Sequence, residues 1–140
     1  MNGKKIILCL IILTIVSISI VALLHYFSYP ERTKRATTTL DKSQKFSQSE
    51  VEVAAKCVYD YFFNKDDMYL KKLWYDEESS TLDVKSYMTA GKGLTNGVDE
   101  SNVTVLYTDH HAGQNYNKYV WILIRDNKTD DWRIDDSGTI

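Results

Sequence analysis

The chain has 140 residues, a formal net charge of −2 and two cysteines, Cys9 and Cys57. The segment from residue 46 onward carries ten Lys and Arg against seventeen Asp and Glu. Nucleic-acid binding needs clustered cations that neutralise phosphates, so this acidic balance argues against a nucleic-acid partner. One cysteine lies in an apolar run and the other in the acidic segment, so we expect no disulfide framework.

The strongest pattern is an apolar run, Ile6 to Phe27, which contains no Asp, Glu, Lys or Arg. At about 1.5 Å per residue, some 20 helical residues match a bilayer core roughly 30 Å thick. Aromatic residues gather at its far end, as at membrane interfaces, and Pro30 ends the helical pattern. We therefore expect residues 1–27 to be a short cytoplasmic head and a transmembrane anchor. The membrane is then a binding partner of the protein, contacted through Ile6 to Phe27.

Cleavage and orientation of this segment stay open. Lys4 and Lys5 before an apolar run resemble a secretory signal, with Ser17 to Ser19 as a weak cleavage candidate. We expect retention as an anchor, with secretion after cleavage near Ser19 as the alternative. Three basic residues after the run oppose an extracytoplasmic domain under the positive-inside rule, whereas the short signal-like head favours it. We expect the domain on the extracytoplasmic side of the cell membrane; the opposite orientation places it in the cytoplasm.

Residues 28–45 carry five basic and two acidic residues and no apolar periodicity. This composition predicts a solvated linker, suited to anionic lipid headgroups or an acidic wall polymer. The remaining residues, 46–140, are enough for one small domain with a modest core.

The domain opens with a helix signal. Ser47 and Glu50 fit a capping box, and Phe46 and Val51 flank it as a hydrophobic staple. Apolar residues at helical spacing follow, so we predict a helix from about Gln48 to Phe63.

Shorter helices are predicted next. Apolar positions in Asp67 to Tyr75 predict a short second helix or helical turn. Asp76 to Ser80 reads as a polar break with exposed carboxylates. Thr81 to Ala90 predicts a third short helix that Gly91 ends, and Asn96 begins a turn pair in the loop that follows.

The last third predicts an antiparallel sheet. Val103 to Thr108 is β-branched and aromatic, and Asp109 to Lys118 reads as a polar connection. Tyr119 to Arg125 is apolar on both faces, so we expect a central strand covered on one side by the first helix. Trp132 to Asp136 returns beside it as a hairpin. Helices followed by antiparallel strands indicate an α+β domain.

Four blocks carry a family resemblance: Leu73 to Ser79, Asn96 to Val98, Trp121 to Asp126 and Trp132 to Gly138. They resemble a family of unknown function found in small secreted, lipidated or membrane-anchored proteins of Gram-positive, clostridia-like bacteria. The last block is also similar to the final strand of cystatin-like cones such as nuclear transport factor two. The resemblance implies helices on a curved antiparallel sheet around a pocket and a surface location. No catalytic residue carries over.

Aromatic residues at periodic positions predict a core, and some could line a pocket at the wide end of the sheet. The pocket that we predict is lined by Trp74, Tyr87, Trp121, Trp132 and Asp135. Asp135 or Asp136 beside a tyrosine is the acid–base pair that an enzyme of this shape would use.

Other chemistry-bearing residues have simpler interpretations. His110 and His111 read as part of a solvated loop, since adjacent histidines point apart in an extended chain and no third ligand follows. Cys57 reads as an inert core thiol. The acidic stretch Asp126 to Asp131 lacks the glycine and distal glutamate of a calcium loop and reads as a hairpin turn. We thus expect no catalytic residue, cofactor or metal.

The leading hypothesis is a non-enzymatic, single-pass, membrane-anchored surface protein whose domain binds a protein or an envelope component. One alternative is a small-molecule-binding or acid–base enzyme cone. The other is an accessory subunit of a membrane machine.

Overall fold

The computed structural model describes Ser17 and residues 33–139. The predicted anchor, Ile6 to Phe27, and the cleavage candidate at Ser19 lie outside the described residues, Ser17 excepted. Within the described part, no helix has the length and apolar character needed to cross a membrane.

The predicted α+β class is confirmed, with a five-stranded sheet in the order β1-β2-β3-β4-β5. Neighbouring strands are antiparallel except β1, which runs parallel to β2, so the sheet is mixed rather than wholly antiparallel as predicted. The strands are β1 Thr37–Leu40, β2 Met68–Tyr75, β3 Val103–Ala112, β4 Asn115–Ile124 and β5 Arg133–Thr139. The helices are α2 Gln48–Phe63, α3 Glu77–Ala90 and the short α4 Gly93–Asn96, followed by a 3-10 turn at Glu100–Asn102.

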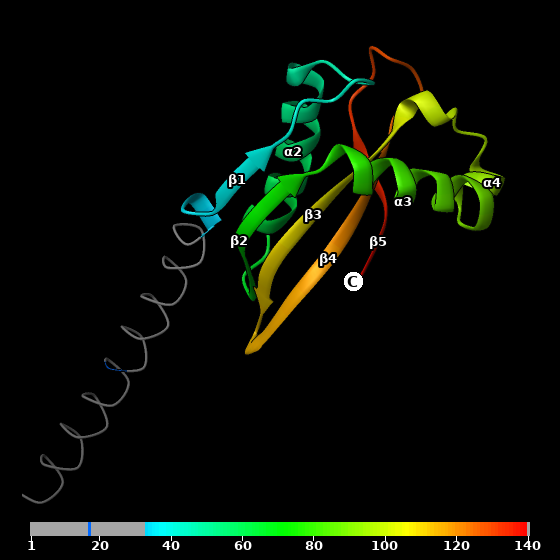
Figure 1. Cartoon of the computed structure of the whole chain (residues 1–140). Coiled ribbons are helices and arrows are strands. Elements are labelled where there is room, and N and C mark those ends of the chain that lie inside the picture. The colour runs from blue at the N-terminus through cyan, green and yellow to red at the C-terminus, as the bar shows by residue number, and fades with distance from the viewer. Residues whose placement is uncertain (1–16, 18–32, 140) are drawn as a thin grey trace, which may run out of the picture.

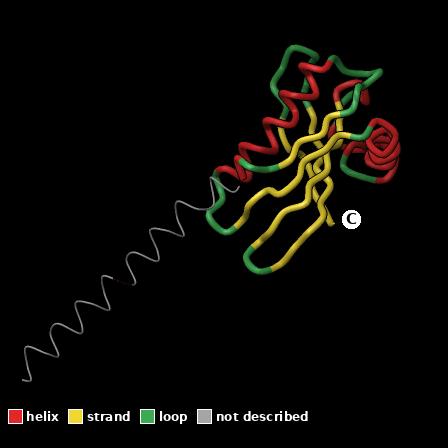
Figure 2. Tube along the Cα trace, turned by 60° about the vertical axis from the view of Figure 1, so that its left-hand side comes forward, coloured by secondary structure: helices red, strands yellow, loops and turns green. Residues whose placement is uncertain are grey.

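Helices cover both faces of the sheet, α2 on one side and α3 on the other (Figures 1 and 2). Side chains alternate along a strand, so β3 and β4 contribute to two separate cores. The α2-side core contains Leu106, Trp121 and Leu123 with the buried stripe of α2. The α3-side core contains Val84, Tyr87, Val103, Val105, Tyr107 and Ile124. Burial on both faces explains why both alternating sets of side chains in the β4 segment are apolar.

Helix α2 begins and ends where the sequence predicted. The Ser47 N–H donates to Glu50 Oε2 at 2.8 Å, and the Glu50 N–H donates to Ser47 Oγ at 3.3 Å, which confirms the capping box. Phe46 and Val51 are buried in the same core, as a hydrophobic staple requires.

The predicted second helix is wrong, because residues 68–75 form strand β2. The pairing of β2 with β3 shifts register between Leu70 and Lys72, which marks a β-bulge. One extra residue there places Leu70 and Leu73 on the same buried face although they are three positions apart. A bulged strand thus reproduces the spacing of a helix.

The predicted polar break after β2 is the first turn of α3. Asp76 is the N-cap, and its Oδ1 accepts from the Ser79 N–H at 2.7 Å. Glu77 and Glu78 then lie at the helix N-terminus, where carboxylates are favourable. The Tyr75 hydroxyl donates to the Glu77 carboxylate, so Glu77 is not simply exposed. The predicted end of this helix is confirmed, since Gly91 is its C-cap.

Two polar segments form strands that the sequence did not predict. Residues 37–40 of the predicted linker form β1, an exposed edge strand without apolar alternation. The predicted connection 109–118 continues the β3–β4 hairpin and leaves only a two-residue turn, with Gly113 at φ 58°. The prediction that His110 lies in a solvated loop is therefore wrong: its exposed fraction is 1%.

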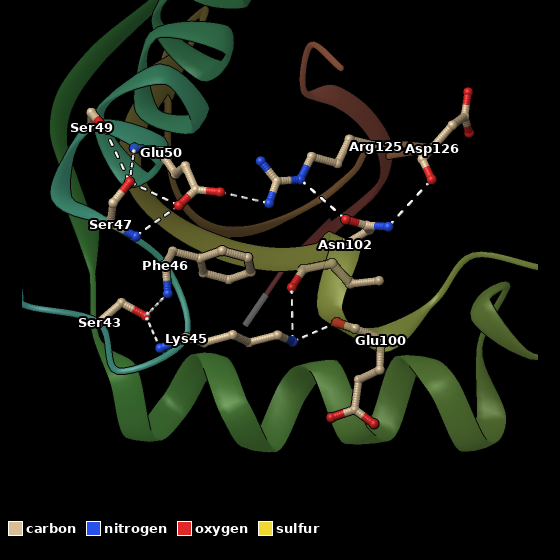
Figure 3. A network of polar contacts seen from close by, with 11 residues as sticks. Ser43, Lys45, Phe46, Ser47, Ser49, Glu50, Glu100, Asn102, Arg125 and Asp126 are labelled. Atoms are coloured by element: carbon tan, nitrogen blue, oxygen red, sulfur yellow. Dashed lines mark hydrogen bonds and ion pairs between the residues drawn. The ribbon is translucent and has the colours of Figure 1, made fainter. Parts of the chain in front are cut away.

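One buried ion pair joins α2 to the end of β4 (Figure 3). Arg125 Nη2 lies 2.7 Å from Glu50 Oε1, and the Arg125 side chain is 4% exposed. The guanidinium carbon lies 4.4 Å from the ring centroid of Trp132 and 5.7 Å from that of Phe46. Hydrogen bonds from the Ser47 backbone and from Arg125 lower the pKa of Glu50 to about 2. Ionised Glu50 thus serves both the cap and the ion pair.

Arg125→Met should destabilise the fold by about 3 kcal/mol, because breaking a buried pair leaves the Glu50 charge without its partner. Urea unfolding followed by tryptophan fluorescence measures the loss. Lys128→Met, at an exposed position of the β4–β5 loop, should stay within about 0.5 kcal/mol of the wild type. A loss below about 1 kcal/mol in Arg125→Met would show that the pair does not hold α2 to the sheet.

Candidate functional site

The structure divides the five predicted pocket residues between the two faces of the sheet. Trp121 and Trp132 are buried in the α2-side core. Trp74 and Tyr87 belong to the α3-side core, and Asp135 hydrogen-bonds to Tyr87. The only pair among the five that the structure brings into hydrogen-bonding contact, within the described residues, is Tyr87 and Asp135.

Tyr87 links α3 to β5 and to α4. Its hydroxyl donates to Asp135 Oδ2 at 2.7 Å and accepts from the Asn96 side-chain amide. Burial, and then the Asp135 carboxylate, raise the pKa of Tyr87 to about 12. A Cβ on Gly93 would lie 2.7 Å from Tyr87 Cε1, so the ring requires glycine at this position. The phenol is protonated at neutral pH and has partners for both its proton and its oxygen.

A hollow of about 290 Å³ lies beside Tyr87, between α3 and strands β4 and β5. We call it the α3 groove; its lining residues are Asp83, Ser86, Tyr87, Ala90, Gly91, Val120, Ile122 and Asp136. Val120 and Ile122 are half-buried and provide apolar lining. The two carboxylates have partners within the fold: Asp83 Oδ2 accepts from the Tyr107 hydroxyl at 2.7 Å, and Asp136 Oδ1 lies 3.3 Å from Lys92 Nζ.

On the face of the sheet that α3 covers, strands β2, β3 and β4 extend beyond the helix (Figure 1). Here Lys72, Asp109 and Lys118 occupy paired positions on β2, β3 and β4. Both lysines are exposed, and Asp109 is half-buried. Among the described residues, the buried Asp109 Oδ1 has no hydrogen-bond partner. We call this row, with Trp74 and Val120 above it, the open face.

Aromatic and cationic groups meet on the open face. Lys72 Nζ lies 4.9 Å from the ring centroid of Trp74, and Trp74 stacks on Tyr107 at 5.6 Å. The buried Asp109 oxygen is out of reach of a ligand, but exposed lysines beside the half-buried Trp74 ring can bind a ligand that is anionic and also carries an apolar group. Val120 belongs to both the open face and the α3 groove, so the two regions adjoin.

Little in the amino-acid sequence predicts this surface. Lys72 and Asp109 become neighbours only through the register set by the bulge in β2. Asn96 was recognised as a turn residue, but its contact with Tyr87 joins positions nine residues apart across the end of α3. Of these contacts, only the one between Tyr87 and Asp135 agrees with a prediction from the sequence, namely that Asp135 or Asp136 lies beside a tyrosine.

His110 and Cys57 lie away from the groove. The His110 ring lies 4.8 Å from that of Phe62 and 5.0 Å from that of Tyr119. Burial, and then the neighbouring His111, lower the pKa of His110 to about 4. The Cys57 thiol donates to the Trp132 carbonyl at 3.4 Å, and burial raises its pKa. Neither group is poised as a base or a nucleophile at neutral pH.

No protein family, curated protein or solved structure matches this chain. Among the described residues, no three His, Cys, Asp or Glu side chains are grouped so that they could hold a metal ion. The α3 groove and the open face are therefore the features from which a function can be inferred.

His110 should make stability depend on pH. The unfolded chain takes up a proton near pH 6.5, but the folded chain does so only near pH 4. Stability is therefore full above pH 6.5 and falls by up to about 3 kcal/mol as the pH drops through this window. Urea unfolding between pH 7 and pH 5, where the Glu50 carboxylate contributes little, should show this fall in the wild type and in His111→Gln, and a much smaller one in His110→Leu. An unchanged pH profile in His110→Leu would contradict the assignment.

Tyr87→Phe should cost about 1–2 kcal/mol, because the Asp135 carboxylate loses a hydrogen-bond donor. Thermal or urea unfolding measures the change. Tyr61→Phe is the matched control, since the Tyr61 hydroxyl makes no hydrogen bond within the described part of the chain; it should change stability by less than about 0.5 kcal/mol. If both variants were as stable as the wild type, the Tyr87 cluster would not be what holds α3 to β5.

Proposed function

We propose that this is a single-pass, membrane-anchored protein whose extracytoplasmic domain binds a protein or an envelope component. The apolar run over residues 6–27 supplies the anchor, and the α3 groove with the open face supplies the binding surface. The observation that carries the proposal is the row Lys72–Asp109–Lys118 beside a hollow with apolar lining. Apolar shape with a few well-placed polar groups is typical of binding sites.

The polar groups of the groove favour binding over catalysis. Tyr87 and Tyr107 each donate to a carboxylate, and in both cases burial and that carboxylate raise the tyrosine pKa. A general base or acid works best with a pKa near the operating pH, and these phenols are far from it. Lys92 lies against Asp136 and donates to the Asp135 carbonyl at 2.9 Å. These groups stabilise the fold and shape the groove.

The alternative is a small-molecule-binding or acid–base enzyme. One observation favours it: the 2.7 Å contact between Tyr87 and Asp135 lies at the edge of a hollow large enough for a small ligand. Asp135 would be the acid–base group and Tyr87 its positioning partner. The second alternative is an accessory subunit of a membrane machine, in which the open face would contact a neighbouring subunit.

The resemblance of the four sequence blocks to a family of surface proteins supports a location outside the membrane. We propose that the chain is related to small surface proteins of Gram-positive bacteria and to the cone-shaped domains of the nuclear transport factor two type. Supporting features are the long N-terminal helix α2 and the β3–β4–β5 meander, which such domains share as a general plan. The parallel strand β1 and the helix on the second face depart from that plan.

Photo-crosslinking from the full chain in intact cells tests the proposal. A photoreactive residue at Ser86, in the groove, or at Lys118, on the open face, should give the same crosslinked product. The same residue at Lys56, on the exposed face of α2, should not. Lys118→Glu should reduce the yield from Ser86 several-fold, whereas Lys56→Glu should leave it unchanged.

Two results would contradict the proposal. Equal crosslinking from Lys56 and Ser86 would show that the groove is not the binding surface. Protection of the domain from added protease until the cells are lysed would show that it does not lie outside the membrane.

A further inference from the structure

One end of the domain gathers cations and aromatic rings from three separate segments. We call it the N-proximal end; it comprises residues 33–35, 63–71 and 111–116. The Leu70 N–H donates to Thr33 Oγ1 at 3.3 Å, which joins the first segment to the second. The Gly113 N–H donates to the Asp67 carbonyl at 2.8 Å, which joins the second to the third. The three segments therefore form one continuous surface.

Lysine ammonium groups lie over two exposed aromatic rings on this surface. Phe63 and Tyr116 are 49% and 50% exposed. Lys34 Nζ lies 5.9 Å from the Phe63 ring centroid, and Lys71 Nζ lies 5.5 Å from that of Tyr116. Arg35 and Lys71 also line a hollow of about 190 Å³ with Tyr69 and Leu70. Lysines and arginines whose stems lie along aromatic rings are typical of side chains that meet a lipid headgroup layer.

The charge of the domain is polarised along α2. The N-proximal end carries four cations, Lys34, Arg35, Lys65 and Lys71, against Asp66 and Asp67. The other end, near the start of α2, has an excess of carboxylates: Glu50, Asp99, Glu100, Asp126, Asp130 and Asp131 against Lys45, Arg125, Lys128 and Arg133. The 16 residues of α2 separate the two ends by about 24 Å. An anionic surface would attract one end and repel the other.

The chain length fixes which end can reach a bilayer. Thr33 lies six positions after Phe27, the last residue of the apolar run. Fully extended, six positions span at most about 20 Å. If the run lies in a bilayer, the N-proximal end is held close to the headgroups, and the acidic end is farther away by the length of α2.

We propose that the N-proximal end docks on the anionic lipid headgroups of the membrane in which the protein is anchored. This inference rests on the proposed anchor. Phe63 and Tyr116 insert at the headgroup level, and the four cations neutralise lipid charge. Docking holds the domain upright, so that β3 and β4 run away from the membrane and the α3 groove opens to the side. The domain is then oriented by its own surface and not only tethered.

Tryptophan quenching by brominated lipids tests the docking on the full chain. The protein is reconstituted in vesicles of phosphatidylcholine alone or of an equimolar mixture with phosphatidylglycerol. Phe63→Trp should be quenched several-fold more than the matched control Thr129→Trp, and more strongly in the anionic vesicles. Lys65→Glu with Lys71→Glu should remove this excess, whereas Lys56→Glu with Lys128→Glu should preserve it. Near-ultraviolet circular dichroism confirms that each variant keeps the wild-type fold.

The outcomes separate docking from anchoring, because flotation of the vesicles reports the anchor. If the protein floats but Phe63→Trp and Thr129→Trp are quenched equally, docking is overturned and the anchor stands. If quenching of Phe63→Trp is the same in both vesicles and insensitive to Lys65→Glu with Lys71→Glu, recognition of anionic headgroups is overturned. If the protein does not float, both proposals fail.

Discussion

The antiparallel pairing of β3 with β4 is the constraint on which the rest of the structure depends. These strands pair over ten positions, and their alternating side chains supply both hydrophobic cores. A sheet buried on only one face would leave half of these apolar side chains in water, so the second helix α3 is needed as much as α2. Because α3 crosses the upper part of β3 and β4 instead of running along them, it leaves the lower part of the sheet uncovered (Figure 1). The open face follows from this crossing.

Polar groups fix how each helix sits on this sheet. Arg125 and Glu50 hold the start of α2 against the end of β4, with the guanidinium enclosed by Trp132 and Phe46. On the other face, tyrosine hydroxyls hold α3 to the sheet. Tyr87 of α3 donates a hydrogen bond to Asp135 on β5, and Tyr107 on β3 donates one to Asp83 of α3. Each contact joins a partly buried carboxylate to a donor that stays protonated at neutral pH. The groove between α3 and β5 is thus held open by bonds at its edges, which leaves its apolar lining accessible.

The sequence predicted those elements whose signals are local. The capping box at Ser47 and Glu50 and the apolar stripe after it located the bounds of α2. The β4–β5 hairpin was predicted as well, but β4 begins four residues earlier and β5 ends three residues later than predicted. Strand β2 was mistaken for a helix because its bulge changes the apolar spacing from two to three. His110 was placed in a loop because polar neighbours hid the strand, although its burial comes from α2 and β4, which are distant in sequence. For the same reason the Lys72–Asp109–Lys118 row could not be predicted: it exists only in the paired register.

The two proposed surfaces place different demands on one small domain. Lipid docking at the N-proximal end needs the tips of the α2–β2 turn and the β3–β4 hairpin, whereas partner binding needs the side of the sheet between those tips and α3. The ring cluster of Tyr69, His111 and Tyr116 lies where the two surfaces meet. In the docked orientation, Lys72 and Lys118 lie just beyond this cluster, close to the headgroups but facing along the membrane. A partner that is itself held at the membrane surface would then meet the open face without the domain having to turn, which lowers the orientational cost of association.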